Sequence, residues 1–108
     1  MNELKNLEEF ENVLKDSEKY TILIDFYADW CMPCKYVAPI LERIEEKYKD
    51  KLKVLKINVE NFPEITMKFG IVGVPTIVII KNREEIDRFV GAASETKIIE
   101  WLKENNII

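Results

Sequence analysis

The 108-residue sequence contains no histidine, and this absence narrows the chemistry open to the protein. Histidine is the commonest metal ligand and the usual general base near neutral pH. The sequence also has no block of basic residues, and its formal net charge is −4. Because nucleic-acid binding draws on clustered positive charge, we expect no nucleic-acid partner.

Long hydrophobic runs and targeting signals are missing as well. No run approaches the roughly 18 apolar residues of a membrane-spanning helix, so we expect no membrane association. Residues 1–16 lack the apolar stretch and the small-residue cleavage site of a secretory signal, which predicts a cytoplasmic location. There is no glycine-rich dinucleotide loop, and we expect no bound cofactor.

The composition, with 47% hydrophobic and 33% charged residues, indicates one globular domain over residues 1–108. Apolar spacing predicts four strands and four helices. The expected strands are 20–27, 53–59, 74–80 and 85–90; the expected helices are 7–14 after Asn6, a segment from near Cys31 to Tyr48, 62–69 before Gly70, and the segment after Ser94. Strands alternate with helices early and a hairpin comes late, which is typical of an α/β fold with a mixed sheet and helices on both faces.

The only two cysteines, Cys31 and Cys34, stand in the segment DWCMPCK with Pro33 between them. This spacing suits a metal clip, a structural staple or a reaction centre. One chain supplies two thiols and no imidazole, so a metal site would need two copies to pool their cysteines. A staple is a weak explanation, because a domain of this size can bury a core without cross-links and so short a loop restricts the unfolded chain little. In a reducing compartment such a pair is more often catalytic or metal-binding than structural.

The cysteine pair follows a buried strand, and Pro33 is tolerated in the first turn of a helix. We therefore expect the helix to begin near Cys31, with Cys34 one turn further on and further from water. Residues three apart on a helix are close enough for a disulfide to form and open with modest movement. The helix start would stabilise a thiolate at Cys31, which would attack a substrate disulfide, and Cys34 would resolve the mixed disulfide.

Two polar residues interrupt the expected buried strands: Asp25 lies within ILIDFY and Lys56 within KVLKINV. Burying an unpaired carboxylate is costly, so burial should raise the pKa of Asp25. We expect the two side chains to share a partly hydrated pocket behind the cysteines, with Asp25 as a candidate proton acceptor for Cys34. The alternatives are that Asp25 merely faces an open sheet edge and that the Lys56 stem reaches out to water.

The segments IDFYADWCMPCK, GVPT and VGA, in this order and at these separations, resemble the thioredoxin family over nearly the whole chain. The resemblance implies a thioredoxin fold with about five strands in its mixed central sheet. It implies that Cys31 is the exposed nucleophile and Cys34 the buried resolving thiol of a redox-active disulfide. It further implies that Asp25 assists deprotonation of Cys34 with Lys56 beside it, and that Pro75 is a cis-proline packed against the disulfide.

By the same resemblance, Pro39 kinks the active-site helix, and an apolar surface around the cysteines receives the substrate. This surface would comprise Trp30, Met32, Gly73, Val74, Pro75, Gly91 and Ala92. Three features depart from the family pattern: Met32 stands where glycine is most frequent, Tyr27 replaces a frequent tryptophan, and residues 81–84 lack the usual hairpin glycine.

The leading interpretation is a monomeric dithiol–disulfide oxidoreductase that reduces disulfide-containing client proteins. Its cysteines would be regenerated by a separate thioredoxin reductase. The alternative is an adaptor with the same fold, whose biological activity would survive replacement of both cysteines by serine. A metal-binding pair of copies is the third interpretation, which a metal assay on anaerobically purified protein tests.

Overall fold

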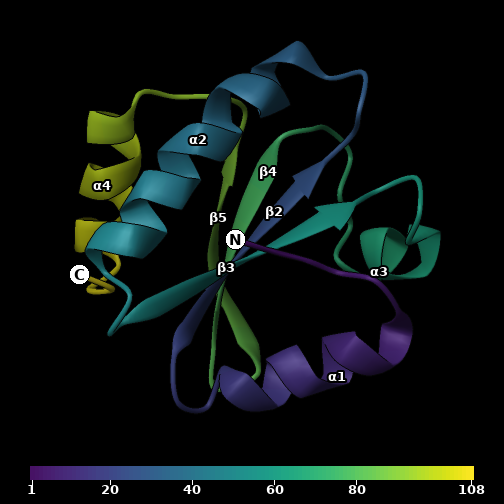
Figure 1. Cartoon of the computed structure of the whole chain (residues 1–108), viewed down its shortest axis with the longest axis horizontal. Coiled ribbons are helices and arrows are strands. Elements are labelled where there is room, and N and C mark those ends of the chain that lie inside the picture. The colour runs from purple at the N-terminus through teal and green to yellow at the C-terminus, as the bar shows by residue number, and fades with distance from the viewer.

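The computed structural model describes all 108 residues and consists of a five-stranded sheet and four helices (Figure 1). The helices are α1 (Leu7–Asp16), α2 (Met32–Lys47), α3 (Pro63–Lys68) and α4 (Glu95–Glu104). The strands are β1 (Asn2–Glu3), β2 (Thr21–Tyr27), β3 (Leu52–Asn58), β4 (Thr76–Lys81) and β5 (Glu84–Val90). No helix combines the length and the hydrophobicity needed to span a membrane. The predicted α/β fold is confirmed.

The strands lie in the order β1-β3-β2-β4-β5. Both β1 and β2 run parallel to β3, whereas β4 is antiparallel to β2 and to β5. The four longer strands match the predicted ones closely, but β1 was not predicted, because two residues leave no alternating pattern. Pro75 precedes β4 and does not lie inside it, since proline has no N–H to give to the ladder.

Each face of the sheet carries its own hydrophobic core. Helices α2 and α4 pack on one face, and α1 and α3 pack on the other (Figure 1). The alternation along β2 shows this division, since Leu23 belongs to the α2–α4 core, and Ile24 and Phe26 belong to the α1–α3 core. Asp25 is two residues from Leu23, so both side chains point to the same face of the sheet. The Asp25 carboxyl group therefore lies on the face that α2 covers.

The predicted helix ends are confirmed by their hydrogen bonds. Asn6 caps α1 by accepting the Glu9 N–H at 2.8 Å, and Ser94 caps α4 by accepting the Lys97 N–H at 3.2 Å. Gly70 follows α3 with a φ of 63°, a conformation in which glycine lacks the steric penalty of other residues.

The turn between β4 and β5 consists of Asn82 and Arg83, whose φ angles are 52° and 68°. Two consecutive residues with positive φ form a type I′ turn, where glycine is usual at the second position. The turn is held by Ser17 at the end of α1. Its carbonyl accepts the Asn82 N–H and its hydroxyl accepts the Arg83 N–H, each at 2.8 Å. The Arg83 side chain also forms ion pairs with Glu11 and Glu18, so α1 supports a turn that lacks glycine.

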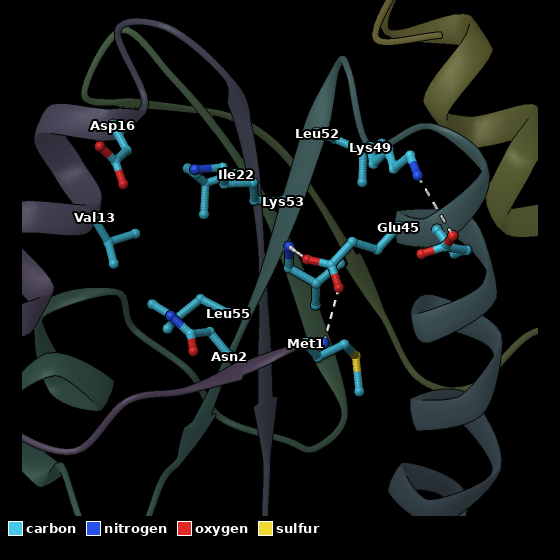
Figure 2. A pocket seen from close by; sticks show the side chains of 12 residues that line it. Met1, Asn2, Val13, Asp16, Ile22, Glu45, Lys49, Leu52, Lys53 and Leu55 are labelled. Carbon is cyan, nitrogen blue, oxygen red and sulfur yellow. Dashed lines mark hydrogen bonds and ion pairs between the residues drawn. The ribbon is translucent and has the colours of Figure 1, made fainter.

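At the outer edge of β3, next to the short pairing with β1, a side chain of α2 binds a backbone N–H that no strand occupies. Strand β1 pairs only with Leu55 and Lys56. Next to this pairing, Glu45 of α2 accepts the Val54 N–H at 2.7 Å, and its other carboxylate oxygen lies 2.9 Å from the amino group of Met1 (Figure 2). These residues border a pocket of about 440 Å³ near the C-terminal end of α2, whereas the cysteines lie at the N-terminal end of that helix.

Candidate active site

The two cysteines lie where the chain passes from β2 into α2. Cys31 is the N-cap residue of α2 and forms a disulfide with Cys34, with Cα atoms 5.3 Å apart. The Cys34 N–H donates to the Sγ atom of Cys31 at 3.2 Å, so this sulfur takes the place of the oxygen of an ordinary N-cap side chain. Pro33 lies in the first helical turn, where its missing N–H leaves no gap in the helix ladder.

This position at the helix start has chemical consequences for the sulfur of Cys31. The unpaired N–H groups and the positive end of the helix dipole favour negative charge there. The first turn of α2 contains no acidic residue that would oppose this effect. A thiolate at Cys31 would therefore be stabilised by the same backbone groups that surround the disulfide sulfur.

The resemblance predicted an exposed Cys31, and in the disulfide form this expectation is wrong. Cys31 and Cys34 are each only 3% exposed. The bond to Cys34 covers one side of the Cys31 sulfur, and the side chains of Ala28, Val59 and Val74 pack around the pair. The physical reason is that the bonded sulfur and these packed side chains together leave little of Cys31 in contact with solvent.

Asp25 is fully buried, and neither oxygen of its carboxyl group has a hydrogen-bond partner. Burial disfavours the charged form and raises the pKa of Asp25 to about 6, against the positive charge of Lys56, which lowers it; the negative charge of Glu3 raises it further. The alternative in which Asp25 faces an open sheet edge is wrong, because β2 lies between β3 and β4.

Asp25 and Lys56 are neighbours in the register of β2 and β3. Together with Cys34 they line a pocket of about 190 Å³ behind the disulfide. The expectation that the two polar residues share a pocket there is confirmed. The Nζ atom of Lys56 lies 4.4 Å from the centre of the Tyr27 ring and forms a cation–π contact with it.

The loop before β4 lies against the disulfide. The peptide bond between Val74 and Pro75 is cis, as the resemblance implies, and the Val74 side chain packs on the cysteine pair. Pro75 is buried, and its carbonyl accepts the Gly91 N–H at 2.8 Å. The backbone N–H and C=O of Val74 have no partner within the chain. An extended peptide beside this loop can therefore form strand-like hydrogen bonds with Val74.

Large apolar side chains are exposed near the cysteines in the sequence. Trp30 and Met32, on either side of Cys31, are 69% and 70% exposed. Val72 is 99% exposed and was not predicted as a site residue. The other predicted surface residues are half-buried or exposed: Gly73, Gly91 and Ala92.

Pro39 lies within α2, where its missing N–H removes one hydrogen bond from the helix interior. The structure contains no group of three or more histidine, cysteine, aspartate or glutamate side chains arranged to hold a metal ion. The two cysteines are bonded to each other, and the pocket lined by Asp25 lies behind them.

A disulfide that spans a single helical turn restrains the unfolded chain very little. The buried, unpartnered carboxyl group of Asp25 behind it costs stability when it is charged, and both features are expected of a site that exchanges electrons and protons. The fold and the site therefore define a thiol–disulfide oxidoreductase.

Comparison with known proteins identifies the family. The thioredoxin family model matches residues 2–104. A thioredoxin of Rickettsia bellii is 42% identical over 95 residues, covering 88% of this chain and 89% of the relative. The chloroplastic thioredoxin Y1 of Arabidopsis thaliana is 38% identical over 101 residues, covering 94% of this chain and 58% of the relative. The X-ray structure of Fasciola hepatica thioredoxin has a TM-score of 0.87 and 31% identity, covering 97% of this chain and 99% of that one. The chain belongs to the thioredoxin family, and the expected thioredoxin fold is confirmed.

Proposed function

We propose that this protein reduces the disulfides of client proteins, with Cys31 as the attacking sulfur and Cys34 as the resolving sulfur. The observation that carries the proposal is the hydrogen bond from the Cys34 N–H to the Cys31 sulfur at the start of α2. It gives Cys31 the backbone donors that stabilise a thiolate. Cys34 lies one turn into the helix and lines the inner pocket, away from an incoming client.

The reaction proceeds in two exchange steps. The Cys31 thiolate attacks one sulfur of the client disulfide, the client S–S bond breaks, and a Cys31–client mixed disulfide forms as a client thiolate leaves. Cys34 then loses its proton and attacks the Cys31 sulfur, which forms the Cys31–Cys34 disulfide and releases the second client thiolate. The client gains two electrons, and its two thiolates take up two protons from the solvent. A thioredoxin reductase supplies the two electrons, and the solvent the protons, that restore the dithiol.

Asp25 takes up the proton of Cys34 in the second step. The two groups line the same pocket, and no hydrogen bond within the protein competes for the carboxyl oxygens. A pKa of about 6 makes both forms of Asp25 accessible near neutral pH, which is what a proton acceptor requires. The positive charge of Lys56 on the neighbouring strand balances the carboxylate before it takes up the proton.

The client is bound as an extended segment beside Val74, whose unpaired backbone groups support strand-like pairing. The exposed side chains of Trp30 and Met32 add apolar contact. The remaining residues of this proposed surface are Gly73, Pro75, Gly91 and Ala92. We assign the protein to the cytoplasm, because a reducing compartment maintains the dithiol form. We further propose that it acts as a monomer formed by one domain.

The test uses oxidised insulin as the client and the Cys34→Ser variant as the trap. This variant should accumulate a mixed disulfide through Cys31, visible by mass spectrometry and released by dithiothreitol. The matched Cys31→Ser variant should accumulate far less, because Cys34 lies one turn into α2, lines the inner pocket and lacks the helix-start position that stabilises a thiolate. Equal trapping by both variants, or none by Cys34→Ser, would refute the assigned roles.

The exposed side chains of Trp30 and Met32 also favour a second candidate function, that of an adaptor. The two functions are separated by the variant in which Cys31 and Cys34 are both serine. An adaptor would keep its biological activity in this variant, and a reductase would lose it.

A further inference from the structure

Three charged residues form one row across three neighbouring strands. Glu3 of β1 is in register with Lys56 of β3, and Lys56 is in register with Asp25 of β2. Residues in register on parallel strands point to the same face of the sheet. The row therefore places a lysine between two carboxyl groups on the face that α2 covers.

Tyr27 of β2 lies next to this row, and its side chain reaches Glu3 of β1. Its hydroxyl donates to the Oε1 atom of Glu3 at 2.7 Å, which links β2 to β1 across the intervening strand. The Nζ atom of Lys56 lies 4.4 Å from the centre of the same ring. A cation at this distance is attracted to the negative face of an aromatic ring. Tyr27 thus contacts both Lys56 and Glu3.

We propose that Tyr27 and Glu3 are positioning residues that control how closely the Lys56 ammonium group approaches the Asp25 carboxyl group. The proposal rests on the proposed role of Asp25 as the proton acceptor of Cys34. The Tyr27 ring holds the ammonium group, and Glu3 fixes the ring through its hydroxyl. If Lys56 formed a close ion pair with Asp25, the carboxylate would be stabilised and would take up a proton less readily.

The groups that affect the pKa of Asp25 come from several secondary-structure elements. Among them, Lys56 lowers the pKa of Asp25 and Glu3 raises it, while burial has the largest effect. Tyr27 is placed to affect both charges because it contacts both side chains. The charged or titratable groups around Asp25 are Glu3 of β1, Tyr27 of β2, Lys56 of β3, Asp29, and Cys34 and Lys35 of α2.

The first experiment follows the Asp25 carboxyl group by ¹³C NMR in the oxidised full chain. Two strand spacings, roughly 10 Å, separate the strands of Glu3 and Asp25. At an effective dielectric constant of about 20, one charge at that distance changes a pKa by roughly one. Glu3→Gln keeps an oxygen that accepts the Tyr27 hydroxyl and should lower the pKa of Asp25 by about 0.5–1 through the loss of charge alone. Glu3→Ala also removes the acceptor, which frees the ring, and should lower the pKa further. The matched control, Glu8→Gln on the exposed surface of α1, should leave the titration unchanged. Equal titrations of Asp25 in Glu3→Gln and Glu3→Ala would overturn the positioning role of Glu3.

The second experiment is a double-mutant cycle between Tyr27 and Lys56. Tyr27→Leu frees the ammonium group to approach Asp25 and should lower the pKa of Asp25. The same change in a Lys56→Met background should lower it much less, because no ammonium group is present. Equal shifts in both backgrounds would mean that the ring acts only by excluding water, and would overturn the proposal. Tyr27→Phe keeps the ring and should give a smaller shift than Tyr27→Leu, which preserves the test if the leucine variant fails to fold.

Disulfide-exchange rates measured against pH separate this proposal from the proposed function. If both hold, the pH profile of exchange in Glu3→Gln moves toward lower pH together with the NMR titration. A shifted titration in Glu3→Gln with an unchanged exchange profile would refute proton transfer by Asp25, and positioning by Tyr27 and Glu3 would then rest on the double-mutant cycle and on the comparison of Glu3→Ala with Glu3→Gln. A shifted exchange profile with an unchanged titration would overturn the positioning proposal.

Discussion

Replacing Asp25 by asparagine should stabilise the protein by an amount that depends on pH. The carboxyl group is buried without a partner, and its pKa is raised from 3.8 to about 6 on folding. Because the folded state binds this proton more tightly, the stability of the wild type is fullest below about pH 4, falls as the pH rises to about 6, and is level above that. At 1.36 kcal/mol for each pKa unit, the loss is about 3 kcal/mol.

The assay is equilibrium unfolding of the oxidised proteins in guanidinium chloride between about pH 4 and pH 8, followed by tryptophan fluorescence. Asparagine has nearly the same shape but no charge, so the variant should lack the fall in stability that the wild type shows. The asparagine amide is itself left without a partner, which adds an offset that does not vary with pH. The matched control is Asp50→Asn at an exposed turn, which should reproduce the wild-type pH profile.

The result that would refute this reasoning is a free-energy difference between wild type and Asp25→Asn that stays constant across the pH range. Such a result would mean that folding does not change the proton affinity of Asp25. A difference that favoured the wild type at neutral pH and faded on acidification would instead show that Asp25 is charged and paired in the folded state.

Three further predictions concern the scaffold and the client surface. Ser17→Ala removes the hydroxyl that accepts an N–H of the β4–β5 turn, so the free energy of unfolding should fall by about 1–2 kcal/mol, measured by chemical denaturation. Hydrogen bonds from Trp101 and Asn105 hold the pKa of Asp87 below its usual value; the stability that they give is present above the unfolded pKa and is lost as the pH falls through the folded one. Asp87→Asn should lack this acid-dependent loss in thermal unfolding. Trp30→Ala should raise KM for a protein disulfide several-fold with little change for a small disulfide, because only the larger client covers the exposed ring.

Much of the scaffold was predictable because its signals are local. The caps at Asn6 and Ser94, and the helix start at Cys31, depend on residues within one helical turn. Strand parity was sufficient to place Asp25 on the same face as Leu23. The type I′ turn was not predictable, because Asn82 and its neighbour are held by α1, which lies far away in the sequence.

The site was predictable only in part, for reasons of register. Asp25 and Lys56 were predicted to share a pocket, but the pattern of either strand alone did not give the register that makes them direct neighbours. The contact of Tyr27 with Glu3 joins residues 24 positions apart and requires β1, a strand too short to leave a pattern. The burial of Cys31 was missed because it depends on the bonded partner and on the loop that carries Val74.

The carboxylate of Glu45 has a consequence for the behaviour of the protein at high concentration. An edge strand with free N–H and C=O groups is a template on which a second molecule can extend the sheet, which is a common route to aggregation. Glu45 occupies the Val54 N–H at the edge of β3, and together with the paired amino group of Met1 it blocks the place where another strand would pair. Without this carboxylate, a protein with an intact disulfide would be expected to self-associate through β3 during concentration or storage.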